Sequence, residues 1–201
     1  RKLFASSTNA DIFGYCGEAF FPTQALSQVV DLINLGVLVA KQPDERCDTV
    51  RELLHASITN YPPEYLAAFS VLYGTRCGEY TNGTFHLFHL KFDGHAFDKA
   101  TPFSMPKHSL HIVTLGSGKR ALDNSLKQLS RSDWDRTSRG MFAAFCNALD
   151  SNADPLSGGA PQLVSVQRRG PAKTFGICYH GQPSICGITP HDGSTLSAIS
   201  W

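Results

Sequence analysis

The stretch DIFGYCGEAFFPTQALSQVVDLINLG, residues 11–36, carries the signals of a strand, a tight turn and a helix in direct succession. Residues 11–17 read as a short strand that enters the turn. Pro22 lies near the start of the helix and Gly36 follows its end, where these residue types are common. The stretch therefore predicts a strand followed by an amphipathic helix, whose apolar face comprises Ala25, Leu26, Val29 and Ile33.

A second helix is predicted directly after the first, in PDERCDTVRELLHASITNYPP, residues 43–63. Pro62 and Pro63 end it, because proline cannot continue a helical hydrogen-bond ladder. Its apolar residues recur at helical spacing. They are Val50, Leu53, Leu54 and Ile58.

The middle of the chain is rich in aromatic and β-branched residues, which favour strands. Three strands, expected to be antiparallel, are predicted in AAFSVLYGT at residues 67–75, GTFHLFHLKFDG at 83–94 and LHIVTLG at 110–116. Between the last two, FDKATPFSMPKH at residues 97–108 is polar and contains proline, so it is predicted as a surface loop.

Two further helices and three further strands complete the pattern. The helices carry apolar faces that include Leu122 and Leu126 in the first and Phe145 and Ala148 in the second. The order is thus strand, helix pair, strands, helix pair, strands. This order suits an α+β fold in which two packed sheets carry a helix layer on each outer face, since every apolar face then has a partner. The last strands are predicted in PQLVSVQRRG (161–170), KTFGICYHG (173–181) and PSICGI (183–188).

Composition limits the classes of partner. Lys and Arg total 18 and Asp and Glu total 17 in 201 residues, so no net field draws the protein to nucleic acid or to an anionic membrane. No apolar run is long enough to span a bilayer, and a soluble cytoplasmic protein is expected. The charged fraction of 17% is below the roughly 25% that is usual, which hints at surface covered by sister subunits. The length fits a single domain over residues 1–201.

The six cysteines are scattered and form no C-x-x-C pair, so buried thiols are expected rather than disulfides or a zinc site. His86, His89 and His95 are close in sequence and raise the question of a metal. The positions of His86 and His89, however, differ by an odd number, so the two side chains would lie on opposite faces of a strand. No metal is therefore predicted.

Three short motifs together carry a resemblance to a known family. LGSGKRALDNSL at residues 115–126 places a serine between glycines where a helix begins, DPLSGG at 154–159 places Asp and Ser between a helix and a strand, and FGYCGE at 13–18 places a glycine after a strand. With the element order from residue 1 to about 170, these motifs resemble the proteasome β-subunit family and its bacterial two-tier relatives. The resemblance implies the four-layer αββα sandwich of the N-terminal-nucleophile hydrolases.

The resemblance also implies roles for particular residues. In the family a threonine at the mature N-terminus attacks a peptide carbonyl, and its own α-amine takes the proton. By ungapped comparison of residues 1–18 Lys2 falls at the catalytic lysine, and by their motifs Ser117, Asp154 and Ser157 match the set that organises the amine. Gly17 falls at a backbone N–H of the oxyanion hole. All four catalytic side chains are then expected to surround one point.

Further implications concern substrate and assembly. Tyr15 and Ala19 would flank the pocket that receives the substrate side chain before the scissile bond. The expected function is a threonine-type peptide-bond hydrolase that acts on peptides or proteins as a homo-oligomer, with an ATPase or another regulator as a possible partner and with no cofactor.

Each of these residues also has an ordinary structural interpretation. Lys2 can be a solvated charge near a terminus. Ser117 can cap the third helix, Asp154 with Ser157 can form a turn, and Gly17 can serve a backbone conformation of positive φ. Cys16, beside the predicted oxyanion position, is either a small buried residue or the nucleophile of a thiol hydrolase.

The sequence departs from the family at its start. A proteasome-type chain has two strands before the lysine, the first led by the threonine, whereas residue 1 here is Arg1. The two strands are thus missing from the sequence or supplied by its C-terminal segment, where HDGST (191–195) would make Asp192 the second catalytic carboxylate. The alternative function is a catalytically inactive proteasome-like scaffold or regulatory subunit, which Arg1 favours.

Overall fold

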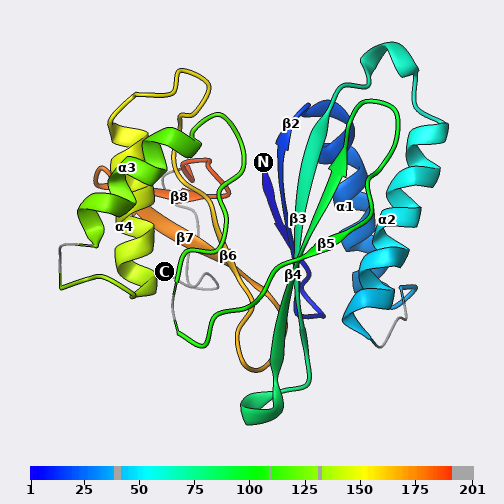
Figure 1. The fold of residues 1–201 in the computed structure, drawn as a ribbon, viewed down its shortest axis with the longest axis horizontal. Coiled ribbons are helices and arrows are strands. Elements are labelled where there is room, and N and C mark those ends of the chain that lie inside the picture. The colour runs from blue at the N-terminus through cyan, green and yellow to red at the C-terminus, as the bar shows by residue number, and fades with distance from the viewer. Residues whose placement is uncertain (39–41, 109, 131–132, 192–201) are drawn as a thin grey trace. The chain divides into compact units, whose positions relative to one another are not determined.

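The computed structural model describes residues 1–38, 42–108, 110–130 and 133–191. Over these ranges the chain is a mixed α+β protein with four α-helices and two antiparallel sheets (Figure 1), as the sequence predicts at this level. Its internal contacts divide it into two compact units. The first comprises Arg1–Ser104 and the residues from Gln162 onward, and the second comprises Met105–Pro161. In the parts described, no helix has both the length and the apolar character needed to cross a membrane.

The first unit is built on a five-stranded antiparallel sheet whose strands follow one another in chain order. Leu3 pairs with Gly14, Asp11 with Thr75, and Phe69 with Phe92. The first strand of this sheet and the last, which falls inside the predicted loop at residues 97–108, are too short to give a sequence signal. The strands are β1 Leu3–Ala5, β2 Asp11–Gly17, β3 Phe69–Cys77, β4 Thr84–Phe92 and β5 Thr101–Pro102.

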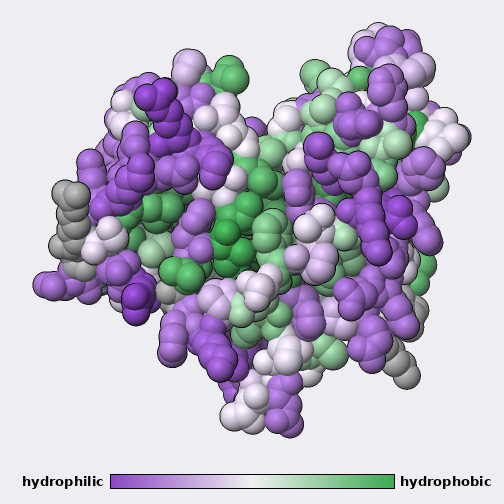
Figure 2. All heavy atoms as spheres, in the orientation of Figure 1, coloured by the Kyte–Doolittle hydropathy of each residue, from purple (hydrophilic) through white to green (hydrophobic). Residues whose placement is uncertain are grey.

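Two helices, α1 (Phe20–Asn34) and α2 (Pro43–Thr59), cover one face of this sheet (Figure 1). Their apolar faces meet alternate strand residues such as Phe13 and Tyr73, whose rings stack 4.8 Å apart. The surface of α2 that faces away from the sheet is largely hydrophilic (Figure 2), as the amphipathic pattern predicts. Short 3-10 turns follow at Pro63–Tyr65 and Tyr80–Asn82.

A second, three-stranded antiparallel sheet belongs to the same unit and comprises β6 (Leu163–Ser165), β7 (Lys173–Tyr179) and β8 (Gln182–Ile185). The guanidinium of Arg76 connects this second sheet to β3. It donates to the carbonyl of Gly170 at 3.1 Å and to that of Gln167, both in the β6–β7 turn. Through these two backbone carbonyls, the Arg76 side chain near the end of β3 holds a turn some ninety residues further along the chain.

The second unit contains α3 (Lys119–Leu129) and α4 (Ser138–Asp150), which pack against each other. The hydroxyl of Thr137 caps α4 by accepting from Gly140 N at 3.0 Å. The predicted strand at residues 110–116 is wrong, since none of these residues belongs to a strand. Its apolar, β-branched composition is compatible with a strand, but a strand also needs a neighbouring edge to pair with, which composition does not specify.

A buried ion pair joins α2 to the sheet. The side chain of Asp11 is 0% exposed, and Arg46 Nη1 lies 3.1 Å from both of its carboxylate oxygens. Tyr73 donates its hydroxyl to Asp11 Oδ1 at 2.7 Å. Burial, together with the Asp11 charge, raises the pKa of Tyr73, so the phenol remains a proton donor. The composition of α2 gave no sign of this pair.

The histidines of β4 lie as the strand period predicts. His86 is paired with Thr75 and His89 with Leu72, at positions of opposite parity, so their side chains leave opposite faces of the sheet. His95 contributes its amide to a turn around Asp93. Within the described ranges no group of three His, Cys, Asp or Glu side chains is arranged to hold a metal ion.

His89 is expected to make stability depend on pH. Burial, reinforced by the Lys91 charge, lowers its pKa from the ordinary 6.5. A lowered pKa in the folded state means that the unfolded chain takes up the proton first, so stability is full above about pH 6.5 and falls as the pH drops below it. His89→Phe keeps an aromatic ring against Phe103 and removes the titration, and is expected to flatten the melting temperature between pH 7.5 and 5.

The control for this experiment is His86→Phe, on the opposite face of β4, which should leave the pH dependence of the wild type intact. An equal loss of melting temperature at pH 5 in wild type and His89→Phe would contradict the assignment.

Candidate functional site

Three residues that the motifs singled out form one hydrogen-bonded cluster in the second unit. Ser117 Oγ donates to Asp154 Oδ2 at 2.7 Å, and Ser157 Oγ donates to the same oxygen at 2.5 Å. Ser117 and Asp154 are 37 residues apart, so the contact depends on how α3 and α4 bring their flanking loops together. We call Ser117, Asp154 and Ser157 the carboxylate cluster.

Local structure explains part of the cluster. Ser157 N donates to the Asp154 carbonyl at 3.1 Å and Leu156 N to Asp154 Oδ1 at 3.3 Å, so this segment is a turn, as its composition predicts. The capping interpretation of Ser117 is wrong, because the N-cap residue of α3 is Gly118 and no side chain caps the helix. The hydroxyl of Ser117 is directed at Asp154 instead. A turn accounts for the backbone of residues 154–157 but not for this long-range bond.

The hydrogen-bond directions define what the cluster can bind. A serine hydroxyl has one hydrogen and two acceptor lone pairs. Both hydrogens are donated to Asp154 Oδ2, so the oxygens of Ser117 and Ser157 remain as acceptors beside a carboxylate. The cluster therefore offers only acceptors to a ligand, which suits the N–H groups of an amine. The start of α3 lies beside Asp154, where the helix dipole favours a negative charge.

In the first unit, Gly17 ends β2 with a φ of +95°, and a Cβ on it would lie 2.6 Å from the carbonyl oxygen of Ala68. The positive-φ interpretation is therefore correct. Glu18 N donates across to Ala68 at 3.2 Å, whereas Tyr15 N donates to the opposite side, to Lys2 O, at 3.2 Å. Because amides two residues apart on a strand point the same way, Gly17 N–H lies on the β1 edge of β2.

Gly17→Ala is expected to lower the free energy of unfolding by about 2–3 kcal/mol, since it combines backbone strain with a steric clash. Gly36→Ala is the matched control, because Gly36 also has a positive φ of +70° but nothing lies within 4 Å of an added Cβ. It should cost only about 1 kcal/mol. Denaturant unfolding of both variants measures the difference, and equal costs would show that the approach of Ala68 is irrelevant.

Lys2 lies at the start of β1 and its side chain is exposed. Its backbone is held by a residue that sequence reasoning missed: Gln162 Oε1 accepts from Lys2 N at 3.0 Å and from Leu3 N at 3.2 Å. Gln162 precedes β6, so this amide ties the second sheet to the edge of the first. No local pattern marks such a contact, because the two residues are 160 positions apart.

Cys16 lies next to Gly17 on β2. Burial raises the pKa of its thiol, while the Lys2 charge and the Ser70 amide act in the opposite direction and are the smaller influences. The thiol is therefore protonated near neutral pH, which is the unreactive form. This disfavours Cys16 as a nucleophile.

Tyr15 and Ala19 meet through Thr23 at the start of α1. Thr23 Oγ1 donates to the Ala19 carbonyl at 2.6 Å and lies 2.7 Å from the Tyr15 hydroxyl. Since the threonine hydrogen is already donated, the Tyr15 hydroxyl is the donor of that second bond. Tyr15 is buried in the core, whereas Ala19 is exposed. Asp192 lies outside the described residues.

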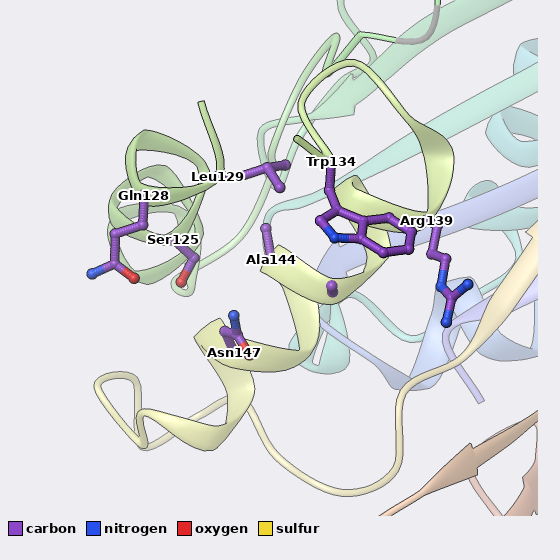
Figure 3. Close-up of a pocket in the computed structure, with 8 residues that line it drawn as sticks. Ser125, Gln128, Leu129, Trp134, Arg139, Ala144 and Asn147 are labelled. Atoms are coloured by element: carbon purple, nitrogen blue, oxygen red, sulfur yellow. The ribbon is translucent and has the colours of Figure 1, made fainter. Parts of the chain in front are cut away.

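The second unit also contains a hollow of about 330 Å³ between α3 and α4 (Figure 3). The guanidinium of Arg139 lies 4.7 Å from the ring centre of Trp134 on one side of it, a cation–π pair. Toward α3 and α4 the lining is mostly polar or small. The lining residues include Ser125, Gln128, Leu129, Ala143, Ala144 and Asn147.

No protein-family model matches this chain, and no curated protein is similar enough to match it.

Proposed function

We propose that this protein is a threonine-type peptide-bond hydrolase of the proteasome-like class, with the αββα sandwich of the N-terminal-nucleophile hydrolases. The observation that carries the proposal is the carboxylate cluster, in which Asp154 accepts from Ser117 and Ser157. All three residues lie in the two motifs, LGSGKRALDNSL and DPLSGG, that carry the resemblance. The resemblance adds homo-oligomeric assembly to the proposal.

In this proposal the cluster holds the α-amine of the nucleophilic residue. The acceptor oxygens of the two serines receive the amine hydrogens and keep its lone pair available, so that it can take the proton of the attacking hydroxyl. The attack forms a bond from the hydroxyl oxygen to the carbonyl carbon, and the amine later returns the proton to the departing amide nitrogen. An ester intermediate remains, which water then hydrolyses.

The resemblance implies further roles for residues of the first unit. Gly17 N–H is the donor for the developing oxyanion, and its position on the β1 edge of β2 supports this role. Lys2 supplies positive potential that favours ionisation of the nucleophilic hydroxyl. Tyr15 and Ala19 are proposed to border the side-chain pocket.

A peptide epoxyketone tests the proposal directly. Its ketone is attacked by a hydroxyl and its epoxide is opened by an amine, so a stable ring forms only on a residue that carries both groups. The protein expressed from its complete gene is expected to gain one probe mass per chain on its N-terminal residue. Mass spectrometry of the intact protein and of its peptides locates the adduct.

Two other results would overturn the proposal. A folded, assembled protein that gains no adduct and cleaves no peptide would favour the non-catalytic scaffold. Labelling of Cys16 by iodoacetamide with parallel loss of hydrolysis would favour the thiol hydrolase.

A further inference from the structure

Gly118 stands where a side chain would collide with the carboxylate cluster. A Cβ built on Gly118 lies 3.0 Å from Ser157 Oγ and 3.4 Å from Asp154 Oδ2. A contact of 3.0 Å is tighter than a Cβ normally makes, so Ser157 Oγ would have to move by a few tenths of an ångström. Gly118 itself has a φ of −71°, which any residue can adopt, so backbone conformation does not require a glycine there.

We infer that Gly118 is a positioning residue of the cluster: the lack of a side chain at the start of α3 leaves the space in which Ser157 donates to Asp154. The activity part of this inference rests on the proposed function, whereas the geometric part does not. The need for this space explains why the second residue after Gly116 in the G-S-G motif is again a glycine.

The effect of Gly118→Ala is expected to fall on the side chain of Ser157. In Gly118→Ala the methyl group displaces Ser157 Oγ, the nearest atom and the one on a rotatable side chain. A shift of Ser157 Oγ by a few tenths of an ångström disturbs the alignment of its 2.5 Å bond to Asp154 Oδ2. Gly118→Ala is therefore expected to mimic Ser157→Ala.

The first test is a double-mutant cycle on thermal stability. Gly118→Ala is expected to lower the melting temperature of the wild type by about 2–4 °C. In the Ser157→Ala background the crowding oxygen is gone, and the nearest remaining atoms, Asp154 Oδ2 at 3.4 Å and the residue 157 Cβ at 3.8 Å, are at ordinary contact distances. There the same change is expected to leave the melting temperature unchanged or raise it, because alanine reduces the freedom of the unfolded chain.

Gly158→Ala is the matched control, since Gly158 lies in the same loop as Ser157 and an added Cβ would meet nothing within 4 Å. It should have the same small effect in both backgrounds. Equal losses from Gly118→Ala in wild type and in Ser157→Ala would overturn the inference, because the clash would then not involve Ser157 Oγ.

The second test measures hydrolysis of a fluorogenic peptide amide by the same variants. Gly118→Ala is expected to lower kcat/KM by tenfold or more, to within about threefold of Ser157→Ala. The double variant should be no slower than Ser157→Ala alone, since residues that act through one group are not additive. A double variant that is slower by the product of the two effects would contradict positioning through Ser157.

The two tests separate the two claims. Coupling in the melting temperatures with no hydrolysis in any variant, wild type included, supports the positioning role and overturns the proposed function. Hydrolysis without coupling supports the proposed function and overturns the role of Gly118.

Discussion

Asp154→Asn is expected to lower kcat/KM for a fluorogenic peptide amide by about 100-fold or more. The carboxylate accepts from Ser117 at 2.7 Å and from Ser157 at 2.5 Å on a single oxygen. An amide presents an NH₂ group or a weaker acceptor at that position, so at least one serine must turn its hydrogen elsewhere. The serine oxygens then lose the orientation that holds the attacking residue's amine. Steady-state hydrolysis of the peptide measures the effect.

The matched control is Asp123→Asn, in α3 of the same unit. Asp123 forms an exposed ion pair with Lys119 at 3.5 Å and does not contact the cluster. It should retain nearly all of the activity, because exposed ion pairs contribute little. Circular dichroism confirms that both variants fold. If Asp154→Asn were as active as Asp123→Asn, the carboxylate cluster would have no part in catalysis and the proposed mechanism would be wrong.

Arg46→Leu is expected to lower the free energy of unfolding by about 3–5 kcal/mol. Its guanidinium is the cation beside Asp11, which is 0% exposed and lies 3.1 Å away. Removal of Arg46 leaves a carboxylate in an apolar core with only the 2.7 Å bond from Tyr73 to stabilise it. The charge then cannot be solvated without opening the packing of α2 on the sheet. Denaturant unfolding gives the free energy.

Two further variants test the prediction for Arg46→Leu. Lys91→Met breaks the exposed ion pair with Asp98 at 3.6 Å and should cost no more than about 1 kcal/mol. The double variant Asp11→Leu with Arg46→Leu should recover most of the loss, since a buried ion pair and an apolar pair of similar volume are often comparable in stability. A single variant Arg46→Leu as stable as Lys91→Met would show that the buried pair has no role in holding α2 to the sheet.

Helices and long strands were predictable because their signals are local. The strand at Asp11–Gly17 has the bounds that the sequence indicates, and the second helix starts at Pro43 as predicted and ends at Thr59, before the two prolines. The periodicity of side chains along one element is set by its own geometry, so it can be read without a partner. The segment at 110–116 shows the limit. Its residues favour a strand, yet no strand forms among those described, because pairing depends on an edge contributed by another part of the chain.

The sequence predicted which residues belong to the candidate site, but not how they contact one another. The motifs and the family resemblance selected Ser117, Asp154 and Ser157, but nothing in the spacing of 37 residues specifies that both hydroxyls would share one carboxylate oxygen. Gln162 and Arg76 were missed altogether. Each holds backbone groups far away in sequence, and a glutamine or an arginine gives no sign of which carbonyl or amide it will meet.

By itself, the sequence determined where four helices and most strands form, which of their faces are apolar, and that the protein is of the α+β class. Those properties follow from the alternation of residue types over short distances. Only the tertiary structure decided that Asp11 is buried against Arg46, that Gly17 approaches Ala68, and that Gly118 leaves room for the bond from Ser157 to Asp154. These contacts depend on the packing of distant segments at a precision of a few tenths of an ångström, which no local pattern of residues encodes.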